Sequence, residues 1–195
     1  MAKVAVVYHS GFGHTKALAE SVAKGAGGVA GATVTLIPVA EAEAREAELT
    51  AADAIIFGAP TYMGSLSADF AKFKDWTSKA WQTQAWKDKI AAGFTNSASW
   101  SGDKLNSLVQ LVTLASQHSM IWVGLGLLPG NNHSKGSVDD LNRVGAFLGG
   151  MAQSNADQGV EGIAKSDFAT MEALGKRVAE VAVRFNGAKV AAAVA

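Results

Sequence analysis

Five short apolar runs alternate with amphipathic helical patterns along this chain, and that alternation constrains the fold more than any other feature. The apolar runs are residues 3–8, 33–39, 54–57, 90–94 and 121–125. The first consists mostly of Val and Ala without polar alternation, which is typical of a strand buried on both faces of a parallel sheet. Strands and helices that alternate in this way predict an α/β fold, a doubly wound parallel sheet with right-handed crossovers.

The helical patterns between these strands place apolar residues three and four positions apart. The clearest begins after Thr15 and has Leu18, Val22 and Ala26 on one face. Further helices are expected over residues 41–49, 68–81, 105–115 and 168–185, and residues 126–166 are interpreted as a long loop. No break in composition divides the chain, so residues 1–188 are predicted to form one domain and residues 189–195 a frayed tail.

Composition restricts the class of function. The chain has 195 residues with 17 basic and 17 acidic side chains, so it lacks the net charge that attracts nucleic acid or an anionic membrane. It has no cysteine, which excludes disulfides, thiolate metal sites and cysteine nucleophiles. Its four histidines are too scattered to suggest a metal site. With no signal peptide and no long apolar span, the protein is expected in the cytoplasm, without membrane or nucleic-acid partners.

Ligands of doubly wound sheets bind beyond the carboxyl ends of the strands, which draws attention to three loops. The first loop opens a helix and reads Ser10-Gly11-Phe12-Gly13-His14-Thr15. Its glycines allow the backbone to curl, and its N–H groups, the helix dipole and two hydroxyls suit a phosphate. The spacing fits neither a P-loop nor a dinucleotide fingerprint. An ordinary turn capped by Thr15 is the alternative interpretation.

The other two loops offer flat apolar groups and room for close backbone approach. Residues 58–65 include Tyr62 and Met63, which either form a platform for a flat ring or pack on the next helix. Residues 95–102 are small and polar apart from Trp100. We interpret Trp100 as a ligand contact or an interface anchor.

These loops, with Ala54–Gly58 before the second and Phe94–Ser97 in the third, resemble the three FMN-binding loops of flavodoxin-like proteins. The resemblance is strongest to WrbA-type NAD(P)H:quinone oxidoreductases and runs in order from Lys3 to about Leu125. It implies a five-stranded flavodoxin-like sheet of order 2-1-3-4-5, with FMN as cofactor and NADH or NADPH as electron donor. The cofactor-binding residues that it implies are Ser10, Gly11, Phe12, Gly13, His14, Thr15, Pro60, Thr61, Tyr62, Met63, Asn96, Ser97, Ala98, Ser99, Trp100 and Ser101.

The resemblance also implies a substrate pocket over the exposed face of the flavin ring. His118 precedes the fifth strand, where the family has a histidine at a neighbouring subunit's site, and Trp81 falls near a family tryptophan over the flavin. With Trp100, these are the expected catalytic residues, in a homodimer or homotetramer. Together with Tyr62 they are expected to form the walls of this pocket. The chain departs from the family at Tyr62-Met63, in the less glycine-rich third loop, and in a shorter segment before Asp53 that affects the tetramer contacts.

Two classes of function follow from this resemblance, with a third in reserve. One is an enzyme in which nicotinamide and quinone bind in turn and two electrons pass through FMN. The other is a flavodoxin-type electron carrier without a small-molecule substrate, and the third is a flavodoxin-like shell that binds no flavin. Carriers of this kind tend to be strongly acidic. The neutral charge and the long final loop therefore favour the enzyme.

Overall fold

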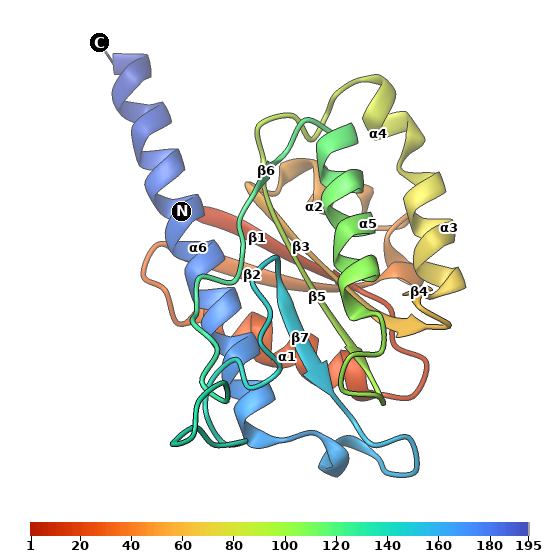
Figure 1. Cartoon of the computed structure of the whole chain (residues 1–195). Helices are drawn as coiled ribbons and strands as arrows, with labels where there is room; N and C mark the ends of the chain where they lie inside the picture. The colour runs from red at the N-terminus through yellow and green to blue at the C-terminus, as the bar shows by residue number, and fades with distance from the viewer. Residues whose placement is uncertain (195) are drawn as a thin grey trace.

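The computed structural model describes the backbone of residues 1–194 and the side chains of residues 1–187. A parallel sheet lies at its centre with helices on both faces (Figure 1). The strands are β1 (Ala2–Tyr8), β2 (Ala32–Pro38), β3 (Ala54–Tyr62), β4 (Ser65–Leu66), β5 (Ile90–Ser97), β6 (Ile121–Trp122) and β7 (Gly150–Gln153). The helices are α1 (His14–Gly27), η1 (Val39–Glu41), α2 (Glu46–Ala51), α3 (Ala68–Trp76), α4 (Ser78–Gln82), α5 (Lys104–Gln117), η2 (Val160–Gly162) and α6 (Lys165–Val194).

The strand order is β2-β1-β3-β5-β6, and the pairs along this path are parallel. In terms of the five apolar runs this is the order 2-1-3-4-5, so the predicted flavodoxin-like sheet is confirmed. The order reverses at β1, which lies between β2 and β3, so the carboxyl ends of β1 and β3 flank the expected ligand crevice.

The edge of the sheet beside β5 is divided between two short strands. β6 pairs with the beginning of β5 at Ile90↔Ile121, and β7 pairs with its end at Asn96↔Ala152. Residues 123–149 are inserted between them. The predictions of one strand over 121–125 and of a loop over 126–166 were therefore wrong in detail. The second half of the strand follows after these 27 inserted residues, and its first residue, Gly150, supplies no apolar signal of its own.

β3 and β5 continue beyond the runs expected at 54–57 and 90–94, into segments that we predicted as loops. Gly58 allows this because its missing side chain makes room for the Phe94 ring, which would lie 2.1 Å from a Cβ at that position. Further along, the hydroxyls of Thr61 and Thr95 bond to each other at 2.8 Å, so polar residues stay in the buried ladder. This extension carries Pro60 and Asn96 to the end of the sheet as paired residues.

Two helices also differ from expectation. The helix predicted over 68–81 ends at Trp76 and restarts at Ser78, because the Thr77 hydroxyl turns back to the Lys74 carbonyl and also meets His118. Of the acidic stretch 41–49, only residues 46–49 are α-helical, in α2, because Val39–Glu41 form a 3-10 turn and residues 42–45 form turns. The backbone of α6 is helical to Val194, and the predicted fraying of 189–195 concerns residues that lie outside the fully described part of the chain.

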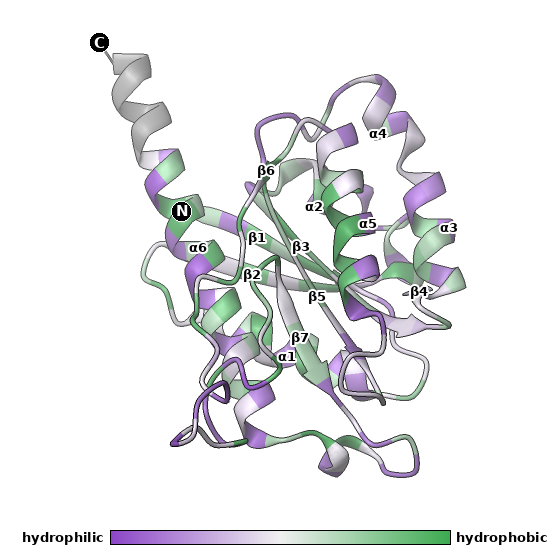
Figure 2. Ribbon diagram, in the orientation of Figure 1, coloured by the Kyte–Doolittle hydropathy of each residue, from purple (hydrophilic) through white to green (hydrophobic). Residues whose placement is uncertain are grey.

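Apolar side chains form one cluster on each face of the sheet. Leu18 of α1 and Leu174 of α6 pack with Val6 on one face, whereas Phe70 of α3 and Leu111 of α5 pack with Phe57 on the other. Figure 2 shows this hydrophobic material along the central strands and on the inner side of α5. Within the described residues, no helix is both long and apolar enough to cross a membrane.

Candidate functional site

A cavity of about 520 Å³ lies at the carboxyl ends of β1, β3 and β5, where the fold predicts a ligand. It is lined by Ser10, Phe12, His14, Thr15, Pro60, Thr61, Tyr62, Met63, Asn96, Ser97, Ala98, Ser154, Ala156 and Gln158. The structure thus brings together residues from all three predicted loops. Ser154, Ala156 and Gln158 come from a fourth segment, after β7, that sequence reasoning missed.

The β1–α1 loop presents an uncapped helix N-terminus to this cavity. Among the described residues no side chain caps α1, and Thr15, the cap of our alternative interpretation, lies inside the first turn. Gly13 has φ 91°, a left-handed conformation that glycine adopts without strain, and its N–H donates to Ser10 Oγ at 3.1 Å. The first N–H groups of a helix have no partner within the helix. With His14 and Thr15 lining the cavity, these donors and the helix dipole fit a phosphate there.

Flat apolar side chains form the rim of the cavity. The rings of Phe12 and Tyr62 meet edge to face, 6.3 Å apart, and Phe12 is 80% exposed. Met63 is fully exposed and adopts φ 48°, at the turn between β3 and β4. A Cβ on Gly11 would lie 2.6 Å from the Tyr62 hydroxyl, so Gly11 allows the ring to approach the loop. Burial raises the pKa of Tyr62, and the backbone hydrogen bond from Gly11 opposes that shift. Such a rim suits a flat aromatic ligand.

Hydrogen bonds connect the floor of the cavity across three segments. The Thr15 hydroxyl donates to Asn96 Oδ1 at 2.7 Å, and Asn96 Nδ2 donates to Ser154 Oγ at 3.2 Å. The chain therefore ties α1 to β5 and to the end of β7. Thr61 is bound in a second buried group, 2.7 Å from the Ser107 hydroxyl. Both networks are satisfied within the protein and hold the loops in place.

Only the first part of the third loop lines the cavity. Ser97 and Ala98 do so, whereas Ser99, Trp100 and Ser101 do not. The Trp100 ring instead stacks over the Arg143 guanidinium, 4.5 Å from the ring centre, and lines a separate surface groove with Leu105 and Val109. In this chain Trp100 is therefore not a wall of the cofactor cavity, because the cation of the inserted segment holds it on the outer surface.

His118 and Trp81 lie together, at the other end of the sheet. His118 follows the last turn of α5 beside the start of β5, and this strand of eight residues is roughly 25 Å long. The two side chains line a cavity of about 440 Å³. His118 Nε2 lies 2.9 Å from the Thr77 hydroxyl, and its ring packs on Trp86 at 4.4 Å. Within one chain neither residue reaches the loop cavity, so a single pocket walled by both of them and Tyr62 is not formed. A role at a neighbouring subunit's flavin stays a prediction.

His118 is expected to make stability depend on pH. Burial lowers its pKa from 6.5 to about 4, and no acceptor binds its Nδ1 among the described residues. The unfolded chain therefore binds more protons between these values. The free energy of unfolding should fall by about 2–3 kcal/mol as pH drops from 6.5 to 4. Denaturant unfolding of the wild type and of His118→Gln measures the difference, and the exposed His133→Gln is the control. If the free energy of unfolding falls equally with pH in all three proteins, the prediction is contradicted.

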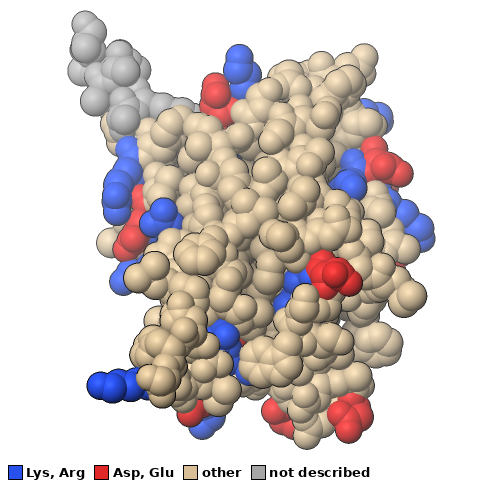
Figure 3. Space-filling model, viewed as in Figure 1, with Lys and Arg blue, Asp and Glu red and all other residues tan. Residues whose placement is uncertain are grey.

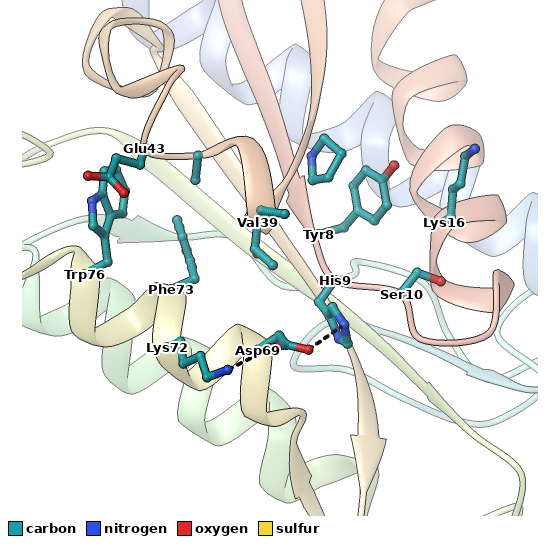
Figure 4. Close-up of a pocket in the computed structure, with 13 residues that line it drawn as sticks. Tyr8, His9, Ser10, Lys16, Val39, Glu43, Asp69, Lys72, Phe73 and Trp76 are labelled. Atoms are coloured by element: carbon teal, nitrogen blue, oxygen red, sulfur yellow. Dashed lines mark hydrogen bonds and ion pairs between the residues drawn. The ribbon is translucent and has the colours of Figure 1, made fainter.

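A further cavity, of about 570 Å³, shares Ser10 with the loop cavity (Figure 4). Here the Asp69 carboxylate lies 3.3 Å from His9 Nε2 and 3.2 Å from Lys72 Nζ. His9 Nδ1 also lies 2.8 Å from Ser67 Oγ. These contacts fasten His9, the residue before the β1–α1 loop, to the start of α3, which fixes where that loop begins.

Fold and cavity together define a flavodoxin-like protein with an open cavity at the carboxyl ends of β1, β3 and β5. Residues 36–155 match the family described as NADPH-dependent FMN reductase. The relative named flavodoxin FldP, from Pseudomonas aeruginosa, is 45% identical and aligns with 93% of this chain and 97% of its own length. An NAD(P)H dehydrogenase (quinone) from Archaeoglobus fulgidus is 32% identical, over 93% of this chain and 98% of its own.

A solved structure supports the same family. The flavodoxin, WrbA-like protein from Agrobacterium tumefaciens matches with a TM-score of 0.75 and 44% identity, covering 94% of this chain and 99% of that one. The chain belongs to the NADPH-dependent FMN reductase family and, within the flavodoxin-like fold, to the WrbA-type proteins. The predicted family is confirmed, and with it FMN and a nicotinamide as the family's cofactor and electron donor.

Proposed function

We propose that the protein is an FMN-dependent NAD(P)H:quinone oxidoreductase. The observation that carries the proposal is the uncapped N-terminus of α1, which opens into a cavity with a flat apolar rim. FMN, when bound, accepts two electrons as hydride from NADH or NADPH and passes them with protons to a quinone. The relatives named NAD(P)H dehydrogenase (quinone) support this activity.

Different residues of the cavity would bind the phosphate and the ring of FMN. The first-turn N–H groups of α1 would hold the phosphate, and Ser10 shapes the loop that presents them. Asn96 and Ser97 place small polar groups at the cavity wall, and Tyr62 with Phe12 offers the flat surface for the ring. No side chain of this cavity is needed as an acid or base, because the cofactor supplies the redox chemistry.

A flavodoxin-type electron carrier is the second candidate, favoured by the name of the relative FldP at 45% identity. A carrier exchanges single electrons with partner proteins, and an acidic shell around the flavin helps by disfavouring its fully reduced anion. This chain has equal numbers of basic and acidic side chains. On the face that Figure 3 shows, charged groups are scattered and the middle is largely uncharged. Neither feature supplies an acidic shell.

The decisive test is reduction by nicotinamide in the absence of oxygen. NADH or NADPH should bleach the flavin absorbance of the FMN-loaded protein directly, and benzoquinone should restore it, over repeated cycles. The rate of bleaching should saturate with nicotinamide because the donor must bind before it reacts. Bleaching by dithionite but by neither nicotinamide would contradict the enzyme and favour the carrier.

We also propose self-association, in a dimer or tetramer, through the apolar surface around Trp100. Trp100, Leu105 and Val109 are about half exposed and line one groove with Val144 of the inserted segment. Exposed large apolar side chains in such a patch are typical of interfaces. Sedimentation of the FMN-loaded protein at micromolar concentration should show an oligomer, and Leu105→Glu should shift it toward the monomer. A wild-type monomer under these conditions would refute the proposal.

A further inference from the structure

Lys104, at the start of α5, is a lysine with no exposed surface. Its Nζ donates to Ser97 Oγ at 2.8 Å and to the carbonyls of Ser99 at 2.8 Å and Trp100 at 2.7 Å. Three acceptors satisfy the three donors of an ammonium group. Ser97 lines the cofactor cavity, so the charge lies directly behind the cavity wall.

The same loop is held from beneath at a third carbonyl. Gln153 Nε2 donates to the Ala98 carbonyl at 2.9 Å, so the carbonyls of residues 98, 99 and 100 all face side-chain donors of the fold. In a trans peptide the next N–H points opposite to the carbonyl. The N–H groups of residues 99–101 therefore point away from Lys104 and Gln153. Over the described part of the chain, no protein acceptor binds them.

The charges around Lys104 leave one positive charge in excess. Arg143 and Asp167 form a buried pair, with Nε–Oδ1 at 2.8 Å and a second bond at 2.7 Å, and this pair is neutral as a whole. The neighbouring Asp103 is exposed. Burial lowers the pKa of Lys104 to about 8, with Asp167 opposing the shift and Arg143 adding to it. At pH 7 most of the protein therefore carries the ammonium.

We propose that Lys104 is a positioning residue of the cofactor site. It fixes the 97–101 loop so that the N–H groups of the loop point away from Lys104, and its charge stabilises the reduced, anionic cofactor more than the oxidised one. The inference rests on the proposed function, because it requires FMN in the cavity. It deepens that function, since a buried positive charge favours complete two-electron reduction, which an enzyme needs and a carrier avoids.

Four variants separate the charge from the hydrogen bonds. Lys104→Gln keeps two N–H donors and removes the charge, Lys104→Met removes both, and Lys104→Arg keeps a cation. Lys79→Met removes an exposed lysine at the other end of the sheet and is the matched control. The dissociation constants of oxidised and reduced FMN are measured without oxygen. Hydrogen exchange of the 98–101 backbone is measured in the cofactor-free protein.

In Lys104→Gln, the ratio of the dissociation constant of reduced FMN to that of oxidised FMN should rise at least tenfold, which corresponds to a reduction potential about 30 mV lower for two electrons. Lys104→Arg should restore most of the ratio, and Lys79→Met should leave it unchanged. In Lys104→Met, the backbone amide hydrogens of residues 98–101 should in addition exchange faster than in the wild type. A ratio in Lys104→Gln within twofold of the wild type would overturn the inference, even if Lys104→Met does not fold. A wild type that binds no FMN would instead overturn the proposed function.

Discussion

Replacing Gly25 or Gly175 with alanine is expected to lower the free energy of unfolding by about 3 kcal/mol or more. A Cβ on Gly25 would lie 1.9 Å from the carbonyl oxygen of Glu172, and one on Gly175 would lie 1.9 Å from that of Val22. Both obstacles are backbone atoms, so no change of rotamer relieves them and α1 must move away from α6. Because α1 presents the phosphate loop, FMN affinity should fall as well. Denaturant unfolding and FMN titration measure the two effects.

Gly27→Ala is the matched control for these variants. Gly27 also lies in α1, but its nearest foreign atom to a new Cβ is Val34 Cγ2 at 3.9 Å, an ordinary contact. Alanine is the better helix former, so this variant should be neutral or more stable by up to about 1 kcal/mol. If Gly25→Ala and Gly175→Ala unfold like Gly27→Ala, the two helices do not cross as closely as the structure places them.

The sheet could be predicted from sequence because each of its core strands carries its own local signal. Runs such as Val4–Val7 and Ile55–Phe57 are apolar without alternation, which places them in a parallel sheet before any partner is known. The loop that opens α1 could be predicted for a similar reason, whereas its phosphate role stays a prediction. Gly11 and Gly13 directly follow such a strand and precede a helical pattern, so the context and the motif occur together.

The parts that were missed depend on pairing between distant residues. β7 and the residues after it reach the cavity only because Asn96 pairs with Ala152, which no local pattern announces. Lys104 looks like an ordinary surface lysine at the start of a helix, and its burial depends on how residues 97–101 fold back over it. The one sequence feature that sets Lys104 apart is its position in the first turn of a helix, where the helix dipole disfavours a cation.

The placement of Trp100, Trp81 and His118 could not be settled from spacing either. Each was assigned to the flavin by resemblance, and the structure puts them in two other places on the chain. The Arg143 guanidinium draws Trp100 outward, and Thr77 with Trp86 holds His118 at the far end of α5. Arg143 and Thr77 each lie more than 40 residues along the chain from the side chain that they contact. Local sequence therefore does not predict these contacts.

FMN is expected to bind about a hundredfold more tightly than riboflavin, which lacks only the phosphate. The difference of about 2.7 kcal/mol is what an uncapped helix N-terminus supplies to a dianion through its dipole and charge-assisted N–H bonds. Quenching of flavin fluorescence on titration of the cofactor-free protein measures both affinities. The preference should shrink as salt is raised, because part of it is electrostatic.

A charge variant tests whether this phosphate lies at α1. His14→Asp places a carboxylate in the first turn, where it favours the helix but repels a phosphate. FMN affinity should fall about tenfold or more while riboflavin affinity changes little. Ala47→Asp adds the same charge in the first turn of α2, beside the start of β1 at the other end of the sheet, and should leave both affinities unchanged. If the wild type binds FMN and riboflavin with equal affinity, the phosphate does not bind at the loop. If His14→Asp lowers the affinities for FMN and riboflavin equally, the phosphate binds elsewhere in the cavity.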